Sequence, residues 1–225
     1  TPSKALHALM AARARVLAEN GPDRQRAWLQ AGQSPQATPA ARYAAALAAH
    51  RLGEVAQALS IARQARASAP AETQRVWDLL QLEVLTGPAG RTLNDPALAG
   101  LRDQALAGTT RADLLLGAQA ALASQGGLSQ AAARLQPWVV NHAGDSLAWL
   151  TLSRVQVAQG QRLRSLRSEA ESRAAQFDYA GAADRLRAAQ QLPAADRNAD
   201  TMELAIIDVR RREVEERQRE SARQD

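Results

Sequence analysis

Glycines that mark turns recur in this chain at a spacing of 34 residues. Gly87 follows Gly53 at that distance, and Gly160 follows Gly126 at the same distance. The sequence around them is rich in alanine and leucine, which are strong helix formers, while only 3% of all residues are aromatic. A period of this length in helix-forming sequence is typical of stacked helical hairpins. The chain is therefore predicted to be all-α, with the architecture of an α-solenoid.

The segment at residues 40–70 shows the layout of one such hairpin. It reads as two helices joined at Leu52 and Gly53 and closed by Pro70. Small residues stand where the paired helices approach closely: Ala46, Ala58 and Ala65. A further first helix is clear from Trp149 to Gly160. This is the layout of the tetratricopeptide repeat, so we expect hairpins of that type.

Two places break the period. The interval from Gly87 to Gly126 is 39 residues, and the additional residues lie in the Gly/Pro-rich stretch at 86–96, which predicts an insertion or an irregular second helix. A turn signature at Gln176–Tyr179 follows Gly160 by only 17 residues, which is half a period. We therefore expect the register of the repeats to slip there by one helix.

Both ends of the chain depart from the repeat pattern. A leading pair of helices is expected at 4–19 and 23–31, followed by a polar linker at 32–39. A long C-terminal helix is expected at 198–222, and its apolar residues share one face: Met202, Ala205, Ile206 and Val209. We predict three parts: an N-terminal helical pair and linker at 1–36, a repeat array at 37–197, and a capping helix with a charged tail at 198–225.

Composition excludes several functional classes. The formal charge of +5 comes from 28 basic residues mixed with 23 acidic ones, so no one-sided basic surface for nucleic acid is expected. No apolar run reaches the length of about 18 residues that a transmembrane segment needs. Without cysteine there is no disulfide or thiolate metal site, and both periplasm and cytosol remain open. Because the chain starts at Thr1 rather than Met, we expect a fragment of a longer protein.

No catalytic or metal-binding motif is found in the sequence. The three histidines, His7, His50 and His142, are scattered, and none is followed by glutamate as a His-Glu-x-x-His zinc motif requires. A Gly-x-Ser-x-Gly elbow, a phosphate-binding loop and a cysteine nucleophile are also missing. The side chains of Glu169 and Glu171 are two residues apart on a predicted helix, so they point in different directions, and they lie among arginines. They therefore indicate surface charge and not a catalytic acid/base pair. We predict no catalytic residue, metal ligand or cofactor in this chain.

Stacked hairpins form a concave surface lined by the first helix of each hairpin, where a peptide can bind. With the turn glycines as reference points, the predicted groove residues are Tyr43, Leu47, His50 and Arg51 in the first unit, Asp78 and Leu82 in the second, and Leu150 and Arg154 farther along. The surface would continue beyond the register slip through Arg164, Arg167 and Glu171. The expected ligand is another polypeptide.

Three stretches resemble a known family. HALMAARARVL at 7–17, ARYAAALAAHRLGEVAQAL at 41–59 and GQRLRSLRSEAESRAAQFDYAGAADRLRAAQQLP at 160–193 are similar to the C-terminal tetratricopeptide domain of periplasmic zinc metallopeptidases of the beta-barrel assembly-enhancing type. The resemblance implies a periplasmic protein in outer-membrane protein quality control. It also implies that zinc is bound only by a preceding peptidase domain outside this chain.

The partner implied by the resemblance is an outer-membrane protein substrate or the barrel-assembly machinery. Two alternatives remain open from the sequence. One is a stand-alone scaffold or co-chaperone without any link to a peptidase, and the other is an enzyme in its own right. The sequence upstream of Thr1 would separate the first two, and metal analysis of the purified chain would test the third.

Overall fold

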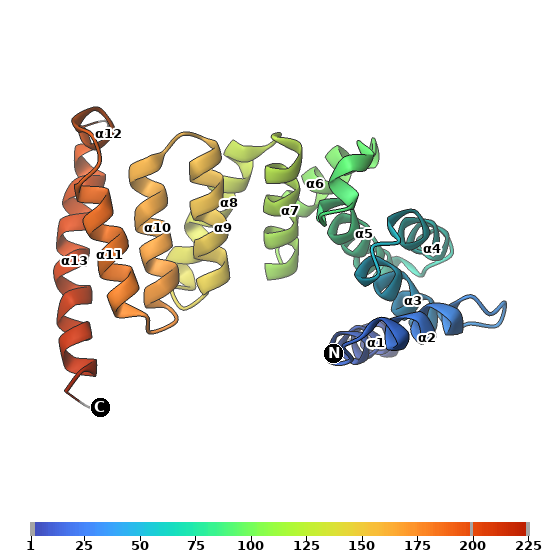
Figure 1. Ribbon diagram of the computed structural model, residues 1–225. Helices are drawn as coiled ribbons and strands as arrows, with labels where there is room; N and C mark the ends of the chain where they lie inside the picture. Colours follow the sequence, from blue (N-terminus) through green and yellow to red (C-terminus); the bar gives the residue numbers. More distant parts are fainter. Residues whose placement is uncertain (1–2, 199, 224–225) are drawn as a thin grey trace. The chain divides into compact units, whose positions relative to one another are not determined.

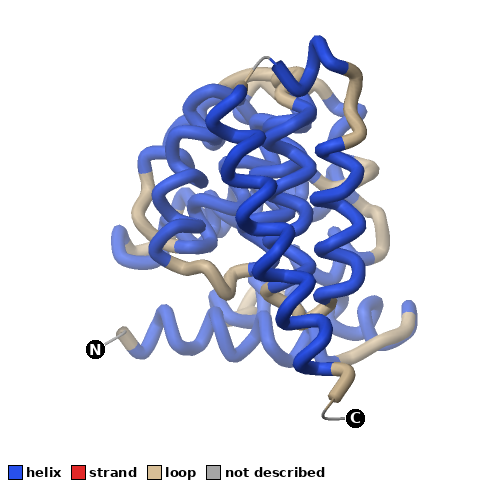
Figure 2. Tube along the Cα trace, turned by 90° about the vertical axis from the view of Figure 1, so that its left-hand side faces the viewer, coloured by secondary structure: helices blue, strands red, loops and turns tan. Residues whose placement is uncertain are grey.

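The computed structural model describes residues 3–198 and 200–223, and all regular secondary structure among them is helical (Figures 1 and 2). The chain divides into two compact units, Thr1–Ala105 and Leu106–Asp225, called unit 1 and unit 2 below. This division falls within one helix, α6. The boundaries predicted at 36/37 and 197/198 lie inside the two units.

The helices follow one another with short connections. The elements that begin in unit 1 are α1 (Lys4–Ala18), α2 (Pro22–Gly32), α3 (Pro39–Arg51), α4 (Val55–Ala67), α5 (Ala71–Thr86), the 3₁₀ helix η1 (Gly90–Leu93) and α6 (Ala97–Ala107). Those of unit 2 are α7 (Arg111–Ser124), α8 (Leu128–Asn141), α9 (Ser146–Ala158), α10 (Arg162–Ala174), α11 (Tyr179–Gln190), α12 (Ala194–Asn198) and α13 (Thr201–Ser221). Consecutive helices pack together through most of each unit, which confirms the predicted all-α fold of helical hairpins.

Small residues let the helices of unit 1 approach closely. The whole run from Tyr43 to Ala49 in α3 is buried. Where α2 crosses α3, a Cβ atom on Gly32 would lie 2.2 Å from the Cβ of Ala45, so only glycine fits there. The small residues predicted at helix contacts, Ala46, Ala58 and Ala65, are buried as expected.

Two apolar clusters lie among the described residues of unit 2. The first joins α7, α8 and α9 and includes Leu114, Leu135 and Leu152. The second joins α10, α11 and α13 and includes Leu186 and Ile207.

Asp145 connects the helices of the first cluster: its carboxylate accepts hydrogen bonds from the Arg111 side chain at 2.7 and 2.8 Å, from Trp138 Nε1 at 3.0 Å, and from the backbone N–H of Ala148 at 3.2 Å. The bond from Arg111 is the largest cause that holds the pKa of Asp145 well below its usual range.

The predicted register slip is visible in the turns. Gly53, Gly160 and Phe177 all have left-handed backbone conformations, with φ of 80°, 73° and 64°. Each donates its N–H to the carbonyl three residues earlier, and the following residue donates to the carbonyl five residues earlier. The same tight turn therefore precedes and follows α10, so two hairpins share this helix.

Two of the glycines used to count the period do not form this turn. Gly87 ends α5 with φ of −66°, outside the left-handed region. At the end of α7 it is Gln125, with φ of 50°, that takes the left-handed conformation, and Gly126 follows it. The irregularity predicted at 86–96 is confirmed, since this stretch contains η1 and a loop instead of a regular second helix.

Phe177 occupies a turn position that favours glycine, and its side chain is 78% exposed. Because a left-handed conformation costs a residue with a Cβ about 1–2 kcal/mol, Phe177→Gly is expected to stabilise unit 2 by up to about 1 kcal/mol. The matched control is Gly160→Ala, where no atom lies within 4 Å of the added Cβ, so only backbone strain acts. It should destabilise by about 1–2 kcal/mol. Urea unfolding measures both, and a destabilised Phe177→Gly chain would contradict the argument.

Candidate polypeptide-binding surface

The groove residues predicted in unit 1 are mostly covered. Tyr43, Leu47 and Leu82 are each at most 2% exposed, so the expectation that they line an open groove is wrong. The physical reason is packing from distant segments: α1 and α5 both contact α3. The ring of Tyr43 also packs edge-to-face on Trp77 of α5, with ring centroids 5.2 Å apart.

An ion pair spans this covered region. Arg13 of α1 donates to both carboxylate oxygens of Glu83 at 2.7 and 3.0 Å, and to the Tyr43 hydroxyl at 3.3 Å. Burial alone would lower the pKa of the Arg13 guanidinium, but Glu83 outweighs that effect and raises the pKa above its ordinary value. Burial raises the pKa of Tyr43. Arg13 is therefore a fixed cation between α3 and α5.

The other three predicted residues of unit 1 have different surroundings. Asp78 is buried and pairs with Arg66 of α4, with a nitrogen–oxygen distance of 3.0 Å, so it links two helices instead of facing a groove. Arg51 is exposed and donates to Asn20 at the corner after α1. His50 is half-buried, and burial lowers the pKa of its imidazole.

In unit 2, the three residues predicted beyond the slip contact the chain's own C-terminal helix. Arg164 pairs with Asp200, Arg167 with Glu203, and Glu171 with Arg210. The expectation that these side chains face an open groove is therefore corrected: they form a row on α10 whose charges are complementary to those on α13 and in the connection before it. A carboxylate or guanidinium held in such a pair can bind an external ligand only if its present partner is displaced.

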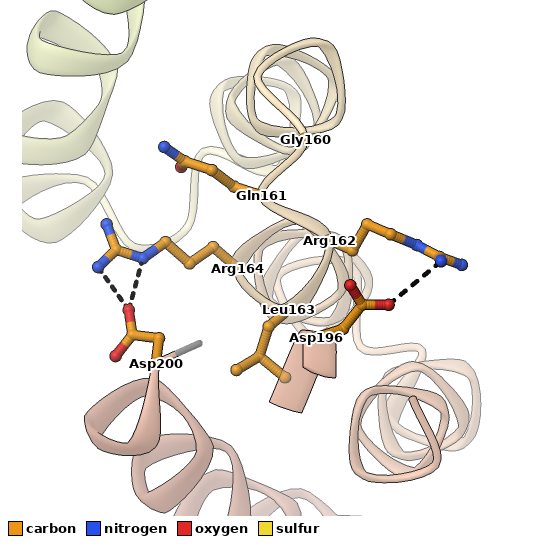
Figure 3. Close-up of a pocket in the computed structure, with 7 residues that line it drawn as sticks. All are labelled: Gly160, Gln161, Arg162, Leu163, Arg164, Asp196 and Asp200. Carbon is orange, nitrogen blue, oxygen red and sulfur yellow. Dashed lines mark hydrogen bonds and ion pairs between the residues drawn. The ribbon is translucent and has the colours of Figure 1, made fainter. Parts of the chain in front are cut away.

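The start of α10 shows this arrangement most clearly (Figure 3). A pocket of about 320 Å³ lies between the start of α10, α12 and the start of α13. Arg162 reaches Asp196 and Arg164 reaches Asp200 across it, at 3.3 and 2.6 Å. Each arginine that lines the pocket is thus matched by an aspartate, which indicates a docking contact within unit 2.

The apolar face predicted on the C-terminal helix is present but points to solvent. Met202, Ile206 and Val209 are all exposed. The buried face of α13 is instead formed by Glu203, Ile207 and Val214. The helix therefore docks through Ile207, Val214 and the partly buried Leu204, together with a set of ion pairs.

One predicted part of the groove is open. Leu150 is half-buried and Arg154 is exposed on α9, the first helix of its hairpin. Leu147, at 40% exposure, and Val157, at 61%, extend this surface along the same helix. These four residues, spaced at i, i+3, i+7 and i+10, lie on one face and are called the α9 ridge below. Through its other faces α9 packs against α7, α8 and α10.

Arg154 lies at the middle of the α9 ridge. Within residues 3–198 and 200–223 its side chain has no hydrogen-bond or ion-pair partner. An unpaired guanidinium flanked by exposed apolar side chains offers both a charge and a contact area to a polypeptide. Leu150 and Arg154 were predicted from the sequence, whereas Leu147 and Val157 were not, although their helical spacing from Leu150 could have identified them.

The described residues contain no group of three or more histidine, aspartate or glutamate side chains that could hold a metal ion. In the same part of the chain, no helix is long and apolar enough to cross a membrane. No known family model matches the sequence, and no curated protein is similar enough to match it.

Proposed function

We propose that this chain is a polypeptide-binding module and that the α9 ridge is its contact surface. The observation that carries the proposal is the exposed apolar face of α9 with the unpaired Arg154 at its centre. Removal of aliphatic side chains from water by a partner lowers the free energy of the complex. Arginine adds a charge-assisted hydrogen bond to a carboxylate.

The chemistry of the ridge describes its ligand. The partner would place aliphatic or aromatic side chains against Leu147, Leu150 and Val157, and a carboxylate within reach of Arg154. Interfaces of this kind concentrate binding energy in a few central residues, among which arginine is frequent. Arg154 and Leu150 are therefore the residues expected to contribute most.

The resemblance of the sequence to the repeat domain of periplasmic zinc metallopeptidases supports a proposed cellular context. In that context the module accompanies a peptidase domain and binds an outer-membrane protein substrate or the barrel-assembly machinery. A stand-alone scaffold is the alternative, and it would use the same ridge. An upstream gene sequence that encodes a signal peptide and a His-Glu-x-x-His motif supports the module of a peptidase. A start codon directly before the codon of Thr1 supports the stand-alone scaffold.

The ridge is tested with unfolded outer-membrane β-barrel polypeptide as the probe, held in dilute urea and titrated by fluorescence anisotropy. Val157→Asp and Arg154→Glu are each expected to weaken binding about tenfold or more, equivalent to about 1.4 kcal/mol. Val140→Asp is the matched control, because Val140 is also exposed but lies on α8, the second helix of its hairpin.

The binding titration has three informative results. Loss of binding in Val157→Asp with unchanged binding in Val140→Asp supports the α9 ridge. Equal loss in both variants indicates a nonspecific effect of added negative charge. Unchanged binding in Val157→Asp and Arg154→Glu removes the ridge from the function, whichever cellular context applies.

A further inference from the structure

In unit 1, α1 does not form a hairpin with the helix that follows it. Its packing partners are α3 and α5, which are the helices expected to line the groove of the first two repeats. Its contacts with α2 are at the corner, where Gln25 Nε2 donates to the carbonyl oxygens of Val16 and Glu19. The position of α1 is thus that of a helix laid onto a repeat surface.

The surface under α1 coincides with the predicted groove. Tyr43, Leu47 and His50 follow one another at i, i+4 and i+7, so they share one face of α3. Together with Glu83 of α5 they define the α1-binding face. Tyr43 and Glu83 both contact Arg13 of α1 directly. Tyr43, a predicted groove residue, is thus contacted by a segment of the same chain.

The contacts of α1 describe which helix fits this face. Its buried residues are Leu9, Ala12 and Val16, at i, i+3 and i+7. Arg13, at i+4, supplies the bidentate pair with Glu83. Its exposed side mixes the polar residues Lys4, His7 and Arg15 with alanines and the exposed Met10 and Leu17. The spacing of the buried residues is that of a helix bound in a groove through one apolar face.

One polar group of the face is left without a partner by α1. The Nδ1 atom of His50 is buried and makes no hydrogen bond to any described residue. Burial lowers the pKa of this imidazole, while the charge of Glu83 acts to raise it and that of Arg13 to lower it. A buried ring nitrogen without a hydrogen bond is costly. A ligand with a hydrogen-bonding side chain at this point would satisfy it, which α1 does not.

The connection between α1 and α2 allows α1 to be a separate element. Gly21 has φ of 115°, a conformation that other residues rarely adopt, and no atom lies within 4 Å of a Cβ placed there. The chain turns at this glycine, and α2 begins immediately after it at Pro22. α2 packs mainly on α3, and its contacts with α1 are few.

We propose that the α1-binding face is a helix-binding site, that α1 is its resident occupant, and that the site accepts an external amphipathic helix in place of α1. The external ligand carries apolar residues at i, i+3 and i+7 and an arginine at i+4. This site lies in unit 1 and does not depend on the α9 ridge of unit 2, so either proposal can fail without the other.

The experiment uses the full chain and a fluorescent, acetylated peptide with the sequence of residues 4–19. In the Leu9→Asp variant an aspartate is forced into the buried face of α1, which disfavours the resident helix. The labelled peptide is expected to bind this variant at least tenfold more tightly than it binds the wild-type chain, because the resident helix no longer competes. Arg13→Gln in the peptide should weaken binding at least tenfold.

Controls use matched positions. Arg15→Gln in the peptide should leave binding unchanged, since Arg15 is exposed on α1. Adding Glu83→Gln to the Leu9→Asp chain should abolish the difference between the wild-type and the Arg13→Gln peptides. Circular dichroism of the Leu9→Asp chain should show loss of no more than the one helix.

Two results would overturn the proposal. If Leu9→Asp unfolds unit 1 as a whole, α1 is an integral part of the core and not an exchangeable occupant. If the Leu9→Asp chain stays folded but binds the peptide no better than the wild type, or binds the Arg13→Gln and Arg15→Gln peptides equally, the face does not recognise a helix of this pattern.

Discussion

Replacing Trp77 with alanine is expected to lower the free energy of unfolding of unit 1 by about 3–5 kcal/mol, the range for truncating a large aromatic side chain in a core. Trp77 is among the largest fully buried side chains. Its ring also packs against Tyr43 at an interplanar angle of 63°, an edge-to-face pair whose energy would be lost in addition to the apolar burial. Urea unfolding followed by far-UV circular dichroism measures the change.

Two further variants make the Trp77 result interpretable. Trp77→Phe keeps an aromatic ring and should recover more than half of the loss. Trp28→Ala is the positional control, because Trp28 is only partly buried and its indole N–H bonds to the Glu19 carboxylate. It should cost clearly less than Trp77→Ala. Equal effects of the two alanine variants would show that Trp77 does not organise the packing between α3 and α5.

The Trp77 variant also bears on the helix-binding site. Tyr43 lies between Trp77 and Arg13, so its ring position determines where its hydroxyl meets the guanidinium. With Trp77 removed, α1 should detach more readily, and the amide hydrogens of α1 should exchange faster than those of α2. Retained protection of α1 would show that Leu9 and Val16 hold it without help from Arg13.

Local sequence signals predicted the helices well. Gly21 and Pro22 separate α1 from α2, Thr38 and Pro39 begin α3, and Asp178 caps α11, each by chemistry contained within a few residues. The register slip was also predictable, because the turn residues at 176–179 are a local signal. In the structure the turn at Phe177 has the same hydrogen-bond pattern as the turn at Gly160. Local signals of this kind do not depend on which distant segment packs nearby.

The exposure of the groove residues was not predictable in the same way. Whether Tyr43 faces solvent depends on Arg13 and Glu83, which are separated by 70 residues in sequence. Helical periodicity fixes which residues share a face of α3, but it contains no information on what covers that face. Leu150 and Arg154 remain predictions, since their surface is open but no contact of theirs with a partner has been measured.

The C-terminal helix shows a signal that sequence analysis could have used. Three residues of α10 with charges plus, plus and minus meet three residues with charges minus, minus and plus at separations of 36, 36 and 39: Arg164 with Asp200, Arg167 with Glu203, and Glu171 with Arg210. Apolar periodicity favoured the face with Met202 and Ile206. Charge complementarity would have selected the neighbouring face with Glu203 and Arg210, which is the one that docks.

Reversing the charge of Arg167 is therefore expected to have the second large effect. The Glu203 side chain is only 7% exposed and Arg167 is 23% exposed. Arg167→Glu would place two carboxylates together at this poorly solvated position. Breaking a buried pair so that one charge stays uncompensated costs about 3–5 kcal/mol. Urea unfolding should show this loss for unit 2, and amide exchange should show α13 detaching before α9.

The double variant Arg167→Glu with Glu203→Arg separates pairing from the loss of any one side chain. If attraction between these two positions docks α13, the swapped pair should recover most of the stability, because opposite charges meet again at the same place. Arg212→Glu is the exposed control: its partner Asp208 is one helical turn away on α13, and both side chains are solvated. That change should stay within about 0.5 kcal/mol. No recovery in the swapped variant would mean that the aliphatic side chains of α13 alone dock the helix, and that the row of ion pairs on α10 sets only its register.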